Sequence, residues 1–134
     1  MPARYEPEDL VVALLAKLRE KNLDRFEANP IRVHPAFFAW RHSPAYGKFL
    51  AQFAFDTRDY FPFSETLEEV LDSLQFAGYL ERTNPRGTWY QITPALQRVF
   101  TEDIAARFEP EDMVLLGRLA DEFANHVSTV GTRG

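Results

Sequence analysis

Residues 64–100 decide the fold, and they read SETLEEVLDSLQFAGYLERTNPRGTWYQITPALQRVF. The first part predicts a helix over residues 64–77, because four apolar residues recur at the i, i+3, i+4, i+7 spacing of one helix face: Leu67, Val70, Leu71 and Leu74. Ser64 or Thr66 can cap its N-terminus, and Thr66 has a glutamate at the capping-box position after it. Gly78 stands where a left-handed residue ends a helix.

Two short segments of alternating polarity follow this helix, at residues 79–83 and 88–92. Between them, Asn84–Gly87 places asparagine, proline and glycine at positions that a type I turn prefers, so we predict a β-hairpin. Thr93 and Pro94 then begin another helix, whose inward-facing residues are Leu96, Val99, Phe100 and Ile104. The decisive stretch therefore predicts a helix, a hairpin and a second helix.

Two longer helices are predicted on either side of this unit. Pro7 begins a helix over residues 7–21, with acidic residues in the first turn, where the helix dipole favours negative charge. A second helix is predicted over residues 111–127, with Met113, Leu116, Leu119 and Phe123 on its apolar face. Val114 and Leu115 widen that face, and Gly117 would let another backbone approach closely.

The segment between the first helix and residue 63 is less regular. We predict a short strand at Ile31–Val33 and a short helix from Pro35 through Trp40. Ser43 and Pro44 suit a cap and a first helical position, so a further helix is predicted there, with Tyr46, Phe49, Leu50 and Phe53 on one face. Residues 56–60 are predicted to form a loop.

The phrases LDSLQFAGYLER and WYQITPALQRVF resemble the recognition helix, wing and following helix of bacterial winged-helix regulators. The resemblance covers roughly residues 44–108. It implies an α+β, mostly helical fold: a winged-helix-like domain with a β-hairpin wing, Arg82–Trp89, and flanking N- and C-terminal helices. Little room remains between Ala54 and Phe63 for the usual positioning helix, so we expect the helix-turn-helix half to be shortened or missing.

The composition is that of one small acidic domain. The chain has 134 residues, no cysteine and a formal net charge of −5. The length predicts a single domain over residues 1–134, and the lack of cysteine excludes disulfides and thiolate-ligated metal sites. A net-acidic protein binds phosphate backbones poorly without a local basic patch. Neither a signal-like apolar region nor a membrane-length apolar stretch is visible in the sequence, so we expect a cytoplasmic protein without a membrane span.

The solvent side of the predicted recognition helix is acidic. At about 100° per residue, Glu65, Glu68, Glu69 and Asp72 share one face, opposite the apolar row. Pressed into a major groove, this face would meet phosphates of the same sign. Three interpretations stay open: a solvated helix face, a binding surface for a basic protein partner, and DNA binding carried by the wing through Arg82 and Arg86.

The sequence indicates no catalytic, cofactor or metal site. His34, His42 and His126 lack metal-ligand spacing, no glycine-rich loop precedes a helix, and no nucleophile is accompanied by a base and an orienting group. We expect His34 and His42, beside Pro35 and Ser43, to serve in turns or caps. We therefore predict that the protein is not an enzyme.

Aromatic residues make up 14% of the chain, with 12 phenylalanines, and most of them precede the recognition helix. In one interpretation Phe49, Phe53 and their neighbours fill the core between the winged-helix unit and the N-terminal helix. In the other, some of them form a self-association or partner interface, because large aromatic residues near arginine are typical of interface hot spots. The candidates for that interface are Phe37, Phe38, Trp40, Tyr60 and Phe61. A homodimer is predicted on this basis.

Taken together, these features favour a non-enzymatic regulatory or scaffolding module that acts through protein–protein contacts. The alternative is a winged-helix transcriptional regulator that contacts DNA through its wing. The charge of the recognition helix decides narrowly for the protein partner.

Overall fold

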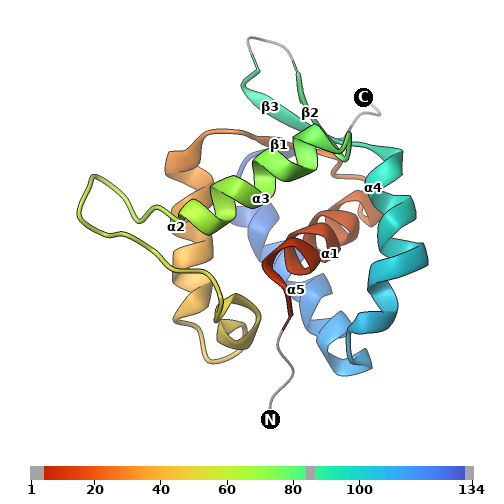
Figure 1. Ribbon diagram of the computed structural model, residues 1–134, viewed down its shortest axis with the longest axis horizontal. Coiled ribbons are helices and arrows are strands. Elements are labelled where there is room, and N and C mark those ends of the chain that lie inside the picture. Colours follow the sequence, from red (N-terminus) through yellow and green to blue (C-terminus); the bar gives the residue numbers. More distant parts are fainter. Residues whose placement is uncertain (1–4, 84–86, 132–134) are drawn as a thin grey trace.

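The computed structural model describes residues 5–83 and 87–131. Over these residues the chain forms an α+β fold that is mostly helical, as predicted, with five α-helices and one four-stranded antiparallel sheet (Figure 1). The helices are α1 (Pro7–Glu20), α2 (Pro30–Arg41), α3 (Glu65–Phe76), α4 (Pro94–Val99) and α5 (Pro110–His126). The strands are β1 (Arg25–Glu27), β2 (Leu80–Thr83), β3 (Trp89–Ile92) and β4 (Thr129–Val130).

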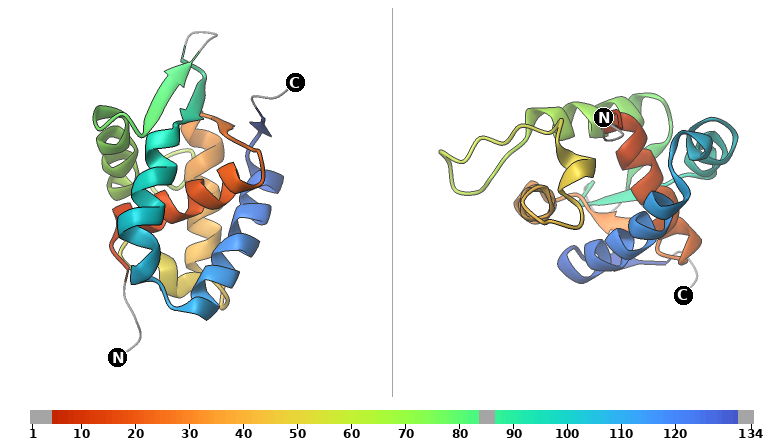
Figure 2. Two further views of the ribbon diagram at one scale, coloured as in Figure 1. Left: turned by 90° about the vertical axis from the view of Figure 1, so that its right-hand side faces the viewer. Right: turned by 90° about the horizontal axis from the view of Figure 1, so that it is seen from below.

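Helix α1 lies at the centre of the molecule, where it packs against α3, α4 and α5 (Figure 2). Its middle is apolar on every side, and the buried residues include Leu10, Val11, Val12, Ala13, Leu14, Leu15, Ala16 and Leu18. A helix that is apolar all round is stable in water only when other elements cover every face. Helix α1 is thus the element around which one contiguous apolar core is built.

The sheet lies at one end of the helices and has the strand order β2-β3-β1-β4. In the pairing of β1 with β3, Phe26 stands opposite Tyr90, and both side chains are buried. The predicted strand at Ile31–Val33 is wrong, because these residues belong to α2. The Asn29 side chain accepts the backbone N–H of Ile31 at 3.1 Å, and this cap begins the helix five residues before the predicted start at Pro35.

The helix predicted after Ser43-Pro44 is also wrong, since only a 3₁₀ turn, Gly47–Leu50, forms there. A Cβ on Gly47 would lie 3.0 Å from the Arg41 carbonyl oxygen, so the chain turns back closely on the end of α2. The predicted apolar side chains Tyr46, Phe49, Leu50 and Phe53 are nevertheless all buried. The hydrophobic pattern therefore holds without the regular helix.

Residues 54–63 form a loop that projects from the body beside the N-terminus of α3 (Figure 1). At its base, Asp56 and Phe63 exchange two backbone hydrogen bonds, of 2.8 and 2.9 Å. The Arg58 guanidinium donates to both carboxylate oxygens of Asp56, and this contact holds the pKa of Asp56 at about 2. Tyr60 lies fully exposed in this loop, which we call the arm.

The decisive stretch folds as predicted. Ser64, rather than Thr66, caps α3: its hydroxyl accepts the Leu67 N–H at 3.2 Å. Gly78 has a φ of 83°, the left-handed conformation expected at a helix end. Strands β2 and β3 form the predicted antiparallel hairpin, while most of its turn lies outside the described residues. Helix α4 runs on through a π-helical turn, Phe100–Ile104, and a short 3₁₀ turn into α5.

Candidate interaction surface on helix α3

Helix α3 presents one face to the core and the other to solvent. The four apolar residues of its inward row are buried, namely Leu67, Val70, Leu71 and Leu74. On the outward face Glu65, Glu69 and Asp72 are exposed, and Glu68 is partly buried beside them. The helix contains no Lys, Arg or His. Three of the four predicted carboxylates are therefore exposed on the outward face, whereas Glu68 contacts the buried His34. We call Glu65, Glu68, Glu69 and Asp72 the acidic face.

A buried histidine anchors this helix to α2. The His34 side chain is 1% exposed, its Nδ1 accepts the backbone N–H of Ser64 at 3.0 Å, and its Nε2 lies 3.0 Å from a carboxylate oxygen of Glu68. Because Nδ1 is an acceptor, the ring proton is on Nε2 and is donated to Glu68. The ring also stacks on Phe63, with centroids 4.4 Å apart.

Burial lowers the pKa of His34, and the neighbouring Glu68 opposes that shift only in part. The neutral ring is therefore favoured by burial and by the Ser64 N–H, which needs an unprotonated Nδ1 as its acceptor. The prediction of His34 in a turn or cap is wrong, because its side chain lies inside and joins α2 to α3. His42, in contrast, acts as a cap as predicted, because its Nδ1 lies 2.9 Å from the Phe38 carbonyl oxygen at the end of α2.

Ser64, His34 and Glu68 are residue types of a hydrolytic triad, but their geometry is not catalytic. The Ser64 hydroxyl is buried and accepts a hydrogen bond within its own helix cap, and His34 contacts Ser64 through the backbone N–H. A nucleophile needs its hydroxyl on the base and open to substrate. In residues 5–83 and 87–131, no group of three or more His, Asp or Glu side chains could hold a metal ion.

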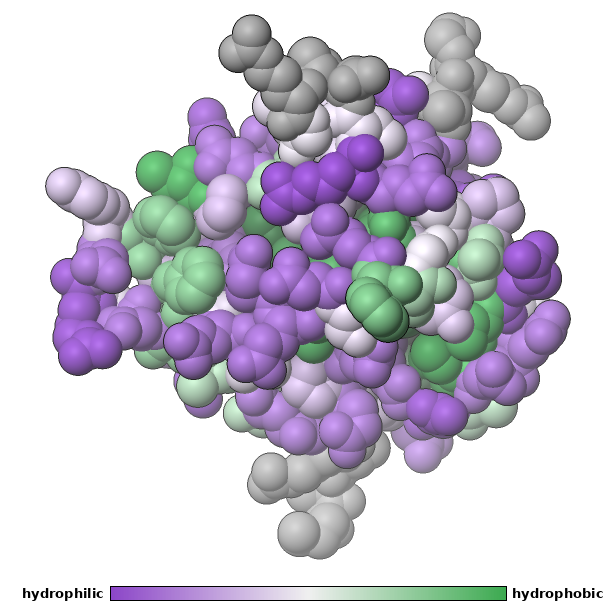
Figure 3. Space-filling model, turned by 45° about the horizontal axis from the view of Figure 1, so that its top comes forward, coloured by the Kyte–Doolittle hydropathy of each residue, from purple (hydrophilic) through white to green (hydrophobic). Residues whose placement is uncertain are grey.

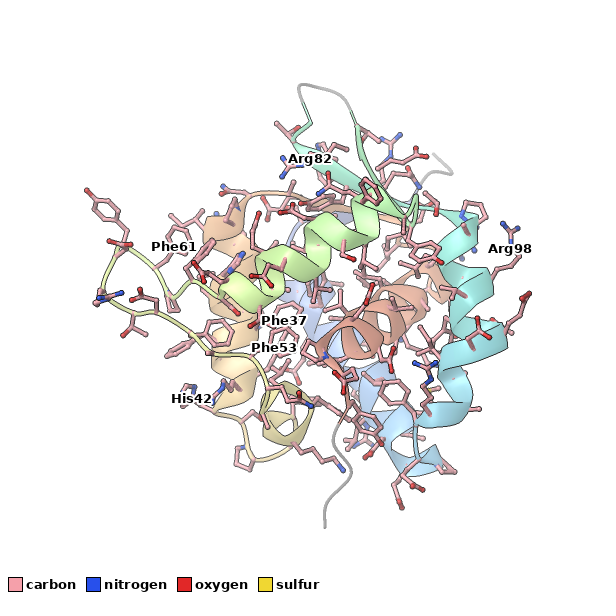
Figure 4. All side chains as sticks on the ribbon, in the orientation of Figure 1. Phe37, His42, Phe53, Phe61, Arg82 and Arg98 are labelled. Atoms are coloured by element: carbon pink, nitrogen blue, oxygen red, sulfur yellow. The ribbon has the colours of Figure 1, made fainter. Side chains whose placement is uncertain are left out.

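On the hairpin, Arg82 lies against its own strand partner. Its guanidinium is 4.9 Å from the centre of the Tyr90 ring, and its nitrogens donate to the Tyr90 hydroxyl at 3.2 Å and to the Gly87 carbonyl at 3.1 Å. Figure 4 shows Arg82 on the hairpin and Arg98 on α4, on separate parts of the surface. Arg86, the second predicted wing contact, lies outside the described residues.

The aromatic candidates divide between core and surface, and this corrects the sequence-based prediction. Phe37 is 2% and Trp40 3% exposed, so neither is available to a partner. Both pack on Phe123 of α5, with ring centroids 6.3 and 6.0 Å away, and Figure 4 shows Phe37 inside the fold beside Phe53. Phe37 and Trp40 are three residues apart on α2, so they share one helix face, and this is the face that packs on α5.

Three of the aromatic candidates keep contact with solvent. Phe38 and Phe61 are partly exposed, and Tyr60 is fully exposed in the arm. The Phe61 ring packs edge-on against Phe63 and lies 6.5 Å from His34. Phe61 therefore lies beside the histidine anchor, and Phe38 contacts His42 and Phe55, which leaves Tyr60 as the fully exposed candidate.

Phe76, the last residue of α3, was not predicted as a surface residue, yet its side chain is 97% exposed. It follows Glu65, Glu69 and Asp72 at the spacing i, i+4, i+7, i+11, so the four residues lie along one line of the helix surface. This spacing was the feature of the sequence that could have placed Phe76 on the surface beside the acidic residues. Figure 3 shows hydrophilic side chains across much of this side of the molecule, interrupted by isolated hydrophobic groups.

A groove of about 440 Å³ runs beside the acidic face, between the N-terminus of α1 and α3. Glu8 and Asp9 line it from α1, and Glu69 and Val70 line it from α3. The cation in its wall, Arg107, is held by Asp9 at 2.8 Å, so its charge is already balanced. The groove therefore extends the negative surface of α3 toward α1.

A second charged cluster ties the first residues of the described chain to α5. Asp112, only 3% exposed, accepts a 2.5 Å hydrogen bond from the Tyr5 hydroxyl and pairs with Lys48 at 2.5 Å. Tyr5 stacks on Phe108, and burial raises its pKa. Lys48 reaches the buried Asp112 carboxylate from the surface, so this cluster ties α5 to Tyr5 and to the Gly47–Leu50 turn.

In comparisons with known proteins, no family model, no curated protein and no solved structure matches the chain. In the described part of the chain, no helix is both long enough and apolar enough to cross a membrane.

Proposed function

We propose that the protein is a non-enzymatic, winged-helix-like regulatory or scaffolding module, and that it binds a basic protein partner through the acidic face of α3. In this proposal α3 takes the place of the recognition helix, β2 and β3 form the wing, and α2 takes the place of the positioning helix. The order of these elements along the chain supports the assignment. The main support for this function is the negative charge of α3. That charge lies on the face that a winged helix turns toward its partner.

The charge of the α3 surface favours a basic partner over DNA. Glu65, Glu69 and Asp72 are exposed, and α3 offers no cation to bridge them to a phosphate. Binding to duplex DNA draws most of its strength from Lys and Arg at phosphates, so this face would be repelled. A partner that presents Lys or Arg gains from the same three charges.

The connection between α2 and α3 supports the same conclusion. A DNA-reading helix-turn-helix joins its helices by a turn of about three or four residues. Here α2 ends at Arg41 and α3 begins at Glu65, and the arm projects between them beside the N-terminus of α3. We predicted that the helix-turn-helix half would be shortened or missing. A helix, α2, does precede α3, but the two are not joined by a tight turn.

The alternative function is DNA binding through the wing, and the exposed Arg82 on β2 favours it. However, Arg82 already donates to the hairpin backbone and to the Tyr90 hydroxyl. One arginine held in this way supplies few phosphate contacts. The protein-partner proposal therefore has the stronger support.

A fluorescence anisotropy titration tests the proposal. In about 50 mM salt, a random DNA duplex should not bind at micromolar protein, whereas a labelled oligolysine peptide should bind and be released by salt. The triple variant E65Q/E69Q/D72Q should lose the peptide, and the charge-matched variant E102Q/D103N/E111Q, at exposed positions on other elements, should keep it. Tight, salt-sensitive DNA binding would overturn the proposal. In that case Arg86→Ala should weaken binding more than Glu68→Ala.

We further propose that the protein self-associates as a homodimer. After Phe37 and Trp40 are assigned to the core, the support comes from α5, where Val114 is 60% exposed and a Cβ added to Gly117 would meet nothing within 4 Å. Light scattering should report twice the chain mass, and Val114→Asp should reduce it. A clean monomer at high concentration would contradict the dimer.

A further inference from the structure

The line of exposed residues on α3 has the geometry of a helix–helix seam. Glu65, Glu69, Asp72 and Phe76 are spaced by four, three and four residues, and at about 100° per residue they stay within a narrow arc. The line is about 17 Å long, at 1.5 Å per residue. Side chains repeating in this way form the contact row of two helices that lie side by side.

Phe76 adds an apolar end to this acidic row. Its side chain is 97% exposed, and in the described residues it makes no ring contact. Single exposed apolar residues are common on protein surfaces. This one, however, continues the row of carboxylates, where an aromatic side chain is a typical anchor of an interface.

The groove between α1 and α3 adds a depression beside this row of α3 side chains. It lies directly beside the seam, because Glu69 belongs to both, and Val70 is an apolar residue in its wall. Glu8 faces it from α1, and the Arg107 charge is balanced by Asp9. A long cationic side chain that entered from the seam would therefore find carboxylates at the rim and apolar surface for its methylene stem.

We propose, on the basis of the function proposed above, that the partner segment on α3 is a basic amphipathic helix. It would place Lys or Arg against Glu65, Glu69 and Asp72, and an apolar side chain against Phe76. A flexible polycation would satisfy the charges and leave Phe76 exposed. A second copy of the chain does not fit, because none of the described helices carries Lys or Arg at three positions with this spacing.

Two labelled helical peptides of identical composition test this inference by anisotropy. The first carries Lys at i, i+4 and i+7 with Leu at i+11, and the second has the same residues with Leu moved to the opposite face. We expect the first to bind about tenfold more tightly, which is the effect of burying a large apolar contact. Phe76→Ala should remove the difference, and Ile31→Ala, at an exposed apolar residue of α2, should preserve it.

The outcomes separate this inference from the function on which it rests. Equal binding of the two peptides, both lost in E65Q/E69Q/D72Q, would overturn the amphipathic partner and leave the acidic face in place. Failure of both peptides, or equal binding of both to the triple variant, would overturn the two proposals together. Circular dichroism of Phe76→Ala should match the parent, since the residue is exposed and outside the core.

Discussion

Helices α2 and α3 each have 12 residues and a capping side chain at the N-terminus, yet their sequences carry different amounts of information. Helix α3 has one apolar row and one acidic row, so its pattern states both its conformation and its orientation. Helix α2 carries apolar residues on most sides and a proline inside. Its pattern indicates burial without saying which side chains face the core. The neighbouring α5 decides that.

The largest expected effect tests whether Phe37 of α2 belongs to the core and not to an interface. Phe37→Ala should lower the free energy of unfolding by about 3–5 kcal/mol, because it removes a buried aromatic ring. Chemical denaturation measures this value. Phe38→Ala, at a partly exposed neighbour, should cost clearly less. If Phe37→Ala changed self-association without changing stability, Phe37 would belong to an interface, as the sequence alone predicted.

The next effect concerns the histidine that joins the two helices. His34→Gln should cost about 1–3 kcal/mol at neutral pH, since it disturbs buried hydrogen bonds to Ser64 and Glu68. In the unfolded chain, a histidine takes up its proton near its ordinary pKa of 6.5, whereas burial lowers the pKa of folded His34. Below that pH the unfolded state therefore binds more protons, and stability falls as the pH falls.

Denaturation of the parent and of His34→Gln from about pH 7.5 to about pH 5.5 measures the contribution of this residue. The parent should lose more stability than the variant over that range. Equal slopes would show that His34 titrates as freely in the folded protein as in the unfolded chain.

A smaller effect tests which residue caps α3. Ser64→Ala should cost about 1 kcal/mol, because the Leu67 N–H loses its acceptor. Thr66→Ala should stay within about 0.5 kcal/mol, since Thr66 lies inside the helix and its hydroxyl has no capping role. Thermal denaturation of the two variants compares them directly. The reverse ranking would return the cap to Thr66.

The smallest effect is expected on the acidic face. Glu69→Gln should change the free energy of unfolding by no more than about 0.5 kcal/mol, because the side chain is exposed. It should still weaken the binding of a basic peptide. A large loss of stability would mean that Glu69 supports the fold, and the contrast between the two faces of α3 would then disappear.

The candidate site was only partly predictable from the sequence. The four carboxylates of the acidic face were recognised because a helix repeats its faces every few residues, and the capping and apolar signals of α3 were strong. Phe76 was missed because an aromatic residue at a helix end is as compatible with the core as with the surface. After Gly78 the chain turns away into β2, so no described side chain covers Phe76.

The sequence by itself determined the elements whose signals are local: α1, α3, the hairpin, α5 and the acidic face. Caps, turns and helical periods depend on residues only a few positions apart, so they are legible along the chain. The tertiary structure alone decided the three-residue strand β1 and the burial of Phe37, Trp40 and His34. This strand and these buried side chains depend on partners far away in sequence, such as Tyr90 for Phe26 and Phe123 for Phe37. Which side chains are buried depends on the apolar surface that those partners expose.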